Sequence, residues 1–418
     1  MCTPIARAIG AGLVLWACFL GRAAAQQDDP AAEMQTLIEA GDAGYLRGDY
    51  EAGRQAFEKA WQLAQETPPE NPVRYDILKR LASIRAAAGE FAEADNYLQM
   101  AINWRENTLG QNDPKIADDL LVSAALCRGM KNYDRADGIL NRVLAMHGRA
   151  SGFESAAVAD DFSRMAQIDM DKKDLPMAES SLNAALAIRK KLAGPLDVSL
   201  VPDLDRLGEV STSRRRYDRA EEAFRRALVI RETLYGREHA DLLATIDGLA
   251  YALFGQKKYA EAEPLYQRLI GLWVWSVGGE HPMVAIALDK VAAFYADQKK
   301  YDQAKEAADR ANAIRAYCLA TGLAQQGAGQ LAEGNKASAM ALYRRALAVL
   351  DPPSPVYQEL RATIEGILKL LEAPPARRPA RKAAPPRRAE AVGPKSVPMS
   401  RDAARTSACA TLHQAERA

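Results

Sequence analysis

Few residues of this sequence have the type and spacing that chemistry would need. The 418 residues include four histidines, and His239 and His281 lie 42 residues apart ahead of similar segments, which favours a role at helix starts over metal binding. Cys127, Cys318 and Cys409 are scattered, which favours neither a disulfide framework nor a zinc site. His-Glu-x-x-His, Gly-x-Ser-x-Gly and phosphate-loop motifs are absent. We therefore predict a protein that is not an enzyme and has no cofactor or metal.

The amino terminus has the pattern of a secretory signal. Arg7 precedes an apolar run over residues 8–20, and alanines at 23–25 precede a polar stretch, which predicts a signal peptide at 1–25 cleaved after Ala25. These thirteen apolar residues are too few to span a bilayer, and no other segment is predicted to do so. We expect a bacterial protein that is periplasmic or secreted. Lipidation at Cys18 is the alternative.

The net charge of +1 hides an acidic body and a basic tail. Residues 373–418 hold ten Lys and Arg against three Asp and Glu, with many Pro and Ala and no apolar periodicity. We expect this tail to be disordered. Its cations could contact an anionic polymer of the cell envelope. The candidate contacts are Arg377, Arg378, Arg381, Lys382, Arg387 and Arg388.

The body of the chain repeats one pattern. Tyr217, Tyr259 and Tyr301 lie 42 residues apart, which is typical of a stacked repeat. Small residues recur nine before and three after each such reference position, and large residues mostly recur seven after it. Two antiparallel helices approach closely only where one of them lacks a bulky side chain, so this alternation predicts packed helix pairs. Together with the high alanine content, it predicts an all-α fold.

The register of the repeat predicts eight helix-turn-helix units, which begin after a frayed stretch at 26–33. A capping helix at 353–372 is expected to cover the last apolar face. Periodic glycines are expected to end the second helices in a left-handed conformation; they are Gly110, Gly152, Gly194, Gly236 and Gly278. The predicted units are 34–67, 75–109, 117–150, 159–192, 201–234, 243–276, 285–318 and 320–350.

This pattern of small and aromatic residues resembles the tetratricopeptide repeat. The period of 42 and phrases such as HPMVAIALDKVAAFYADQKKYDQAKEAADRA resemble the kinesin-light-chain type of that repeat. The resemblance covers about residues 34–350. It implies a right-handed superhelical solenoid whose first helices line a concave groove for a partner.

Three consecutive units supply the candidate groove residues. Twelve residues before the reference tyrosines stand Asp205, Asp247 and Asp289, an acidic ladder suited to a basic, extended peptide. The alternative is that these exposed carboxylates only keep the surface soluble. The kinesin-light-chain repeats usually have an Asn pair here, which argues against inheriting their cargo recognition. The further candidates are Arg206, Glu209, Tyr251, Phe254 and Lys290.

The expected function is that of a non-catalytic scaffold that binds a protein or peptide outside the cytoplasm. One alternative is attachment to the envelope or to a polyanion through the basic tail. Another is that the tail folds back on the acidic ladder as a self-inhibitor. Nucleic acid is not an expected partner, because the signal would take the chain out of the cytoplasm.

Overall fold

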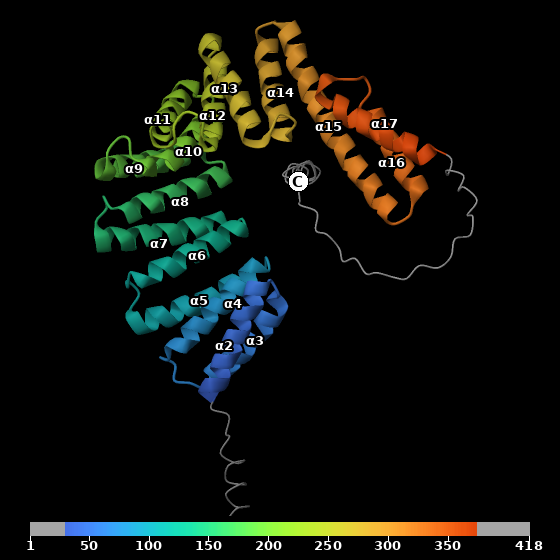
Figure 1. The fold of residues 1–418 in the computed structure, drawn as a ribbon. Helices are drawn as coiled ribbons and strands as arrows, with labels where there is room; N and C mark the ends of the chain where they lie inside the picture. The colour runs from blue at the N-terminus through green and yellow to red at the C-terminus, as the bar shows by residue number, and fades with distance from the viewer. Residues whose placement is uncertain (1–29, 374–418) are drawn as a thin grey trace, which may run out of the picture. The chain divides into compact units, whose positions relative to one another are not determined.

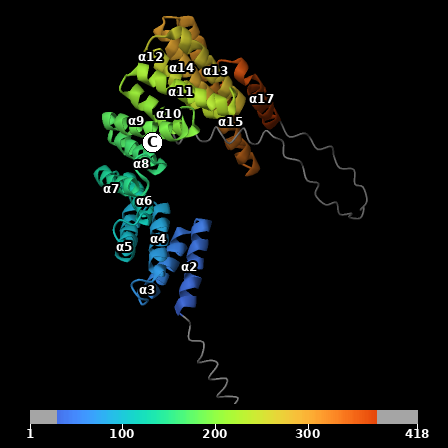
Figure 2. The ribbon, with the colours of Figure 1, turned by 90° about the vertical axis from the view of Figure 1, so that its left-hand side faces the viewer.

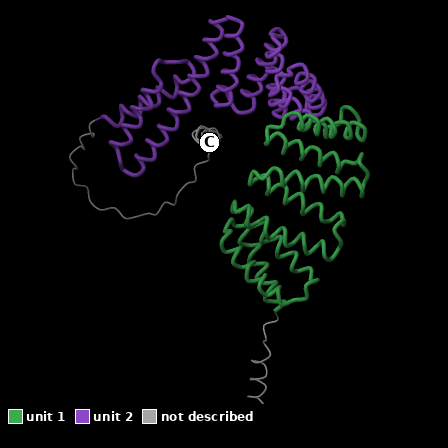
Figure 3. Tube along the Cα trace, turned by 180° about the vertical axis from the view of Figure 1, so that it is seen from behind, with its two compact units in different colours: residues 1–203 green, residues 204–418 purple. Residues whose placement is uncertain are grey.

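The structure, a computed structural model, describes residues 30–373, and the regular elements in that range are all helices. The chain divides into two compact units, residues 1–203 and 204–418 (Figure 3), and each is described by itself. The predicted signal peptide with its cleavage site, Cys18 and Cys409 lie outside the described residues. No helix among residues 30–373 is long and apolar enough to cross a membrane.

The first unit consists of helix pairs that follow one another in chain order, and each helix packs on the next (Figures 1 and 2). The first helix already begins at Pro30, so the expectation that 26–33 is frayed is wrong for its last four residues. Proline suits the first helical position, and Glu33 lies in the same first turn, where a carboxylate is favourable. The helices are α2 (Pro30–Arg47), α3 (Tyr50–Ala64), α4 (Pro72–Ala87), α5 (Phe91–Leu109), α6 (Lys115–Gly129), α7 (Tyr133–Ser151), α8 (Ala156–Lys172) and α9 (Leu175–Ala193), followed by the 3₁₀ turn η1 (Val198–Leu200).

The second unit continues the same plan of paired helices. The division between the units falls within the first turn of α10. The elements are α10 (Val201–Ser213), α11 (Tyr217–Tyr235), η2 (Ala240–Leu242), α12 (Leu243–Gly255), α13 (Tyr259–Val277), α14 (Pro282–Asp297), α15 (Tyr301–Ala332), α16 (Lys336–Val349), η3 (Pro355–Tyr357) and α17 (Gln358–Glu372).

Small residues bring the helices together as the alternation of sizes predicts. In the second unit, the ring of Phe224 on α11 lies between Gly208 of α10 and Gly248 of α12. A Cβ atom on either glycine would stand 2.4 or 2.5 Å from that ring, which no packed structure tolerates. Ala250, at the small position of α12, is fully buried. The close approach of the helices therefore depends on these small residues.

The periodic glycines end five second helices. Their φ angles lie between 80° and 94°, but their ψ angles are extended, as in Gly110 with φ 88° and ψ 152°. The expected positive φ is present, although the conformation is not the left-handed helical one. A side chain is scarcely tolerated in this region of the backbone map, which explains why glycine keeps the period.

The structure departs from the predicted units at the seventh and eighth repeats. Units 285–318 and 320–350 were expected to be separate, yet α15 runs without a break through the boundary at 318–320. Ala320 stands where the period would place the next glycine, and it is fully buried. With alanine in place of glycine at 320 and no proline after it, the alanine-rich helix continues to Ala332, across Gly322, Gly327 and Gly329.

The predicted capping helix begins later than expected. Residues 355–357 form the 3₁₀ turn η3, and α17 starts at Gln358. Prolines at 352, 353 and 355 restrict the backbone before that point. Ile364 and Leu368 of α17 are buried in a cluster with residues of α15 and α16.

Replacing Ala250 by leucine tests this packing. We expect Ala250→Leu to lower the free energy of unfolding by about 1–3 kcal/mol, because the site has no room for three further carbon atoms. Ala260→Leu, at an exposed position of α13, is the matched control and should change it by less than about 0.5 kcal/mol. Urea denaturation measures both, and equal effects would show that the register of small residues is wrong.

Candidate partner-binding site

Buried carboxylates recur where one helix pair stacks on the next. In the first unit, an arginine or histidine near the end of α5, α7 and α9 reaches an aspartate fourteen residues later in the following helix. Arg105 lies 2.8 Å from Asp119. The equivalent pairs are His147 and Asp161 at 2.7 Å, and Arg189 and Asp203 at 3.0 Å. The three carboxyl groups are almost completely buried, so these side chains supply hydrogen-bond partners where water does not reach.

The second unit begins with a variant of this arrangement. Arg231 of α11 lies 2.6 Å from Asp205 of α10. The hydroxyl of Thr245 on α12 donates to the other oxygen of Asp205 at 3.0 Å. Arg231 also contacts Thr245. Both oxygens of the Asp205 carboxylate therefore have a donor from the chain itself.

One repeat later, the residues equivalent to Arg231 and Thr245 do not donate to the aspartate. Trp273 stands where Arg231 stood, and Ala287 stands where Thr245 stood. Asp247 replaces Asp205, and its Oδ1 atom is buried without a hydrogen-bond partner. Its Oδ2 atom forms an ion pair with Lys290 of α14 at 2.5 Å. One carboxylate oxygen thus lacks a donor.

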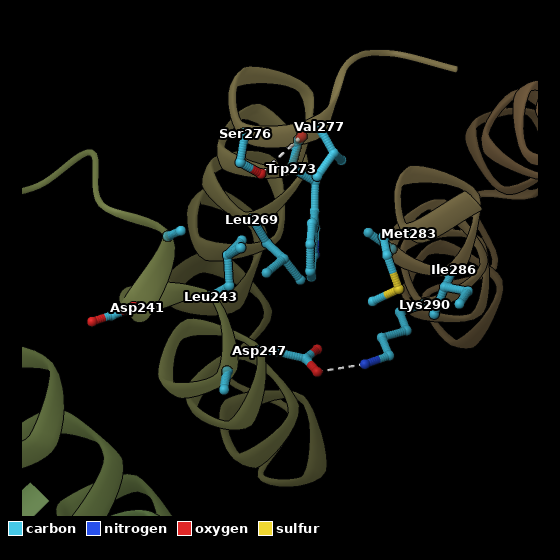
Figure 4. Close-up of a pocket in the computed structure, with 13 residues that line it drawn as sticks. Asp241, Leu243, Asp247, Leu269, Trp273, Ser276, Val277, Met283, Ile286 and Lys290 are labelled. Atoms are coloured by element: carbon cyan, nitrogen blue, oxygen red, sulfur yellow. Dashed lines mark hydrogen bonds and ion pairs between the residues drawn. The ribbon is translucent and has the colours of Figure 1, made fainter. Parts of the chain in front are cut away.

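A pocket of about 700 Å³ lies at this place, between α12, α13 and α14. Figure 4 shows the indole of Trp273 between Leu269 and Met283, with the Asp247–Lys290 ion pair at the lower end of the pocket. Most of the wall is apolar. The lining residues are Ala240, Asp241, Leu243, Ala244, Asp247, Leu269, Trp273, Ser276, Val277, Met283, Ile286, Ala287 and Lys290.

Helix starts hold the rim of the pocket in place. His281 caps α14, and its Nδ1 accepts the backbone N–H of Met283 at 3.2 Å. His239 caps η2 in the same way through the N–H of Asp241. The predicted role of both histidines at helix starts is confirmed. Burial lowers the pKa of His281, which favours the neutral ring that can accept this bond.

The carboxylate of Asp247 acts on a buried neighbour below the pocket. Burial raises the pKa of the Tyr266 hydroxyl, and the negative charge of Asp247 raises it further. The hydroxyl therefore stays protonated at neutral pH.

The acidic ladder is not a row of three free carboxylates. Asp205 is compensated by Arg231, and Asp289 pairs with Arg315 of α15. Asp247 alone among the three has tryptophan at the position of those arginines. Asp205 and Asp289 therefore have partners within the chain, and the suitability of the ladder for a basic peptide stays a prediction.

The other candidate groove residues lie in different surroundings. Lys290 lines the pocket with Asp247. Tyr251 is 45% exposed, and its ring lies 6.3 Å from that of Phe254, on a surface of α12 beyond the pocket. Glu209 is exposed, and Arg206 is partly buried on α10. Of the predicted residues, the pocket brings together Asp247 and Lys290.

Sequence reasoning missed the residues that make the pocket. Trp273, Ala287 and Met283 were not candidates, because the groove was sought on the first helices and at fixed steps before the reference tyrosines. The sequence did contain a sign of the pocket. Positions 231, 273 and 315 are 42 residues apart, and tryptophan at 273 replaces the arginine of the other two. A comparison of that second-helix position across units would have found it.

Two other expectations concern metals and the tail. Among residues 30–373, no group of three or more His, Cys, Asp and Glu side chains is placed to hold a metal ion. The candidate tail contacts lie outside the described residues; they are Arg377, Arg378, Arg381, Lys382, Arg387 and Arg388.

Comparison with known proteins identifies the repeat. Residues 200–273 and 242–316 match the family model of the tetratricopeptide repeat. These residues are tetratricopeptide repeats. Arrays of such repeats are in general non-catalytic scaffolds for protein–protein interaction, and the matched residues include the whole pocket. No curated protein sequence matches the chain.

Solved structures with tetratricopeptide or helical-repeat folds are similar to the chain. RapI in its apo form has 15% identity and a TM-score of 0.53, and the match covers 78% of this chain and 86% of RapI. BtubC (BKLC) from P. vanneervenii has 21% identity and a TM-score of 0.45, covering 59% of this chain and 91% of that one. A putative kinesin light chain from Podosopora anserina has 19% identity and a TM-score of 0.44, covering 49% and 96%. At such identities, the likeness to RapI is one of fold.

The different surroundings of Asp205 and Asp247 lead to a prediction about stability. Asp205→Ala should lower the free energy of unfolding by about 3 kcal/mol, because Arg231 then lacks its carboxylate partner. Asp247→Ala loses a half-exposed ion pair and removes an oxygen that has no donor, so we expect a change within about 1 kcal/mol. Chemical denaturation at neutral pH measures both. Equal losses would contradict the assignment of Asp247 to a site that the fold does not need.

Proposed function

We propose that the chain is a non-catalytic scaffold whose second unit binds an extended segment of a partner protein, with one partner side chain in the pocket of α12, α13 and α14. The observation that carries this proposal is the substitution of Trp273 and Ala287 at an interface position where the preceding repeat has Arg231 and Thr245. Arg231 and Thr245 both contact Asp205, whereas the pocket lies beside Trp273 and Ala287.

The size and walls of the pocket suit a side chain of a peptide. A volume of about 700 Å³ falls within the range of ligand sites in proteins. Its rim continues into exposed apolar surface, since Ile286 is 41% exposed and Val277 is 36% exposed. Exposed apolar groups around a cavity are typical of interaction surfaces.

Closing the site with a donor from the chain itself tests the proposal. In Trp273→Arg/Ala287→Thr, both positions take the residues that stand 42 positions earlier, so the new arginine should pair with Asp247 and take the place of the partner side chain. Peptides selected from a random displayed library on the full wild-type chain should bind this variant at least about tenfold more weakly. The variant should fold, because it copies an arrangement that the chain already contains.

Trp275→Arg is the matched control, since it makes the same substitution on the same helix outside the pocket. It should leave the affinity of the selected peptides within about twofold of the wild type. Peptides that bind the closed and open pockets equally would show that the site lies elsewhere.

We further propose that the scaffold works outside the cytoplasm. The support is the charge and hydropathy pattern of residues 1–25. Expressed in a bacterium, the mature protein should begin at Gln26, which mass spectrometry of the extracytoplasmic fraction determines. A chain that keeps Met1 in the cytoplasm contradicts the proposal, and an acylated Cys18 at the new terminus would favour the lipoprotein alternative.

A further inference from the structure

We infer that the partner side chain that enters this pocket is an arginine, which supplies the guanidinium that the chain itself supplies at the neighbouring repeats. The inference rests on the proposed function and adds the chemistry of the partner. It starts from the buried Oδ1 atom of Asp247, which has no donor.

The neighbouring repeats define what is missing. Asp205 receives a guanidinium from Arg231, 26 residues later, and Asp289 receives one from Arg315 at the same spacing. At that spacing from Asp247 the chain has Trp273. Asp247 thus repeats an aspartate that elsewhere faces arginine, and the pocket lies beside it.

Lys290 does not replace the missing arginine. It follows Asp247 by 43 residues, and the residue at that spacing from Asp205 is Gly248, so the lysine belongs to no repeated arrangement. Its ammonium pairs with Oδ2 and leaves Oδ1 buried without a donor. Asp241 also lines the pocket, but its carboxylate points away from the cavity (Figure 4) and is half exposed beside His239. The acceptor that remains in the pocket is the buried Oδ1 of Asp247.

The shape of the wall favours a flat cation on a long apolar stem. A guanidinium is planar, is weakly hydrated and stacks on aromatic faces, and the indole of tryptophan is the best of these. Trp273 presents its indole beside Asp247, while Leu269 and Met283 line the sides (Figure 4). An arginine could place its methylene groups along these residues and donate an N–H to Oδ1. A purely apolar side chain would leave Oδ1 without a donor.

Short peptides with one changed residue test the inference. The probes are acetylated and amidated pentapeptides with arginine, citrulline, lysine or norleucine at the centre of four alanines, titrated at low salt into the full chain. Binding is followed by the indole N–H resonance of Trp273, which Trp273→Phe assigns. We expect the arginine peptide to bind at least about tenfold more tightly than the citrulline and norleucine peptides.

Two variants connect the selectivity to the carboxylate. Asp247→Asn should remove most of the difference between arginine and citrulline. Asp309→Asn changes an exposed carboxylate of α15 outside the pocket and should preserve that difference. Trp273→Arg/Ala287→Thr should lose binding of the arginine peptide, because its own guanidinium then occupies the place.

The outcomes separate this inference from the function on which it rests. If the norleucine or citrulline peptide binds as tightly as the arginine peptide, or if Asp247→Asn keeps the selectivity, the arginine assignment is overturned and the pocket remains a peptide site. If library-selected peptides need the open pocket but contain no arginine, the assignment is overturned as well. If neither the pentapeptides nor the selected peptides distinguish the open pocket from the closed one, both proposals are overturned.

Discussion

A carboxylate that is buried between stacked helix pairs needs a donor from a neighbour, because burial removes the water that would otherwise solvate it. This constraint recurs along the described repeats, and the chain meets it with arginine, histidine or threonine on the facing helices. Each pairing fixes how the end of one second helix meets the start of the next first helix. The surface that a partner could use is therefore decided by which of these pairings the chain leaves incomplete.

Packing of small and large residues sets the distances at which these pairings operate. Phe224 fits between Gly208 and Gly248, so α10, α11 and α12 are held close with little freedom to adjust. Interiors packed in this way do not collapse easily around a deleted side chain. Trp273 and Ala287 take the places of arginine and threonine in this packing, and the pocket lies beside them. Neither side chain donates to Oδ1 of Asp247, so the exchange leaves this oxygen without a donor.

The sequence was sufficient to predict the helix pairs. Small and large side chains recur at fixed steps within each unit, and eight units repeat the pattern, so it can be recognised without a structure. Asp247 and Lys290 were found among the candidate groove residues for the same reason. Trp273 was not, since its importance depends on a contact across stacked repeats, with Asp247 26 residues earlier. The sequence also contained a sign that α15 would be continuous. Ala320 stands where the next periodic glycine would end the helix, but the prediction used only the five positions that are glycine.

In a repeat array, a position that departs from the repeated pattern is a candidate binding site. The stability of the neighbouring interfaces limits where such a departure is tolerated. Stability is roughly a sum over units and over the interfaces between neighbours, so one weakened interface is tolerated when those on either side are intact. Asp247 lies between two such places, the Asp205–Arg231 pair and the Asp289–Arg315 pair. Loss of a second pairing beside it would leave two carboxylates without guanidinium partners in adjacent repeats. Between these two paired repeats, the chain can therefore leave one oxygen of Asp247 without a donor while the interfaces on either side hold the fold together.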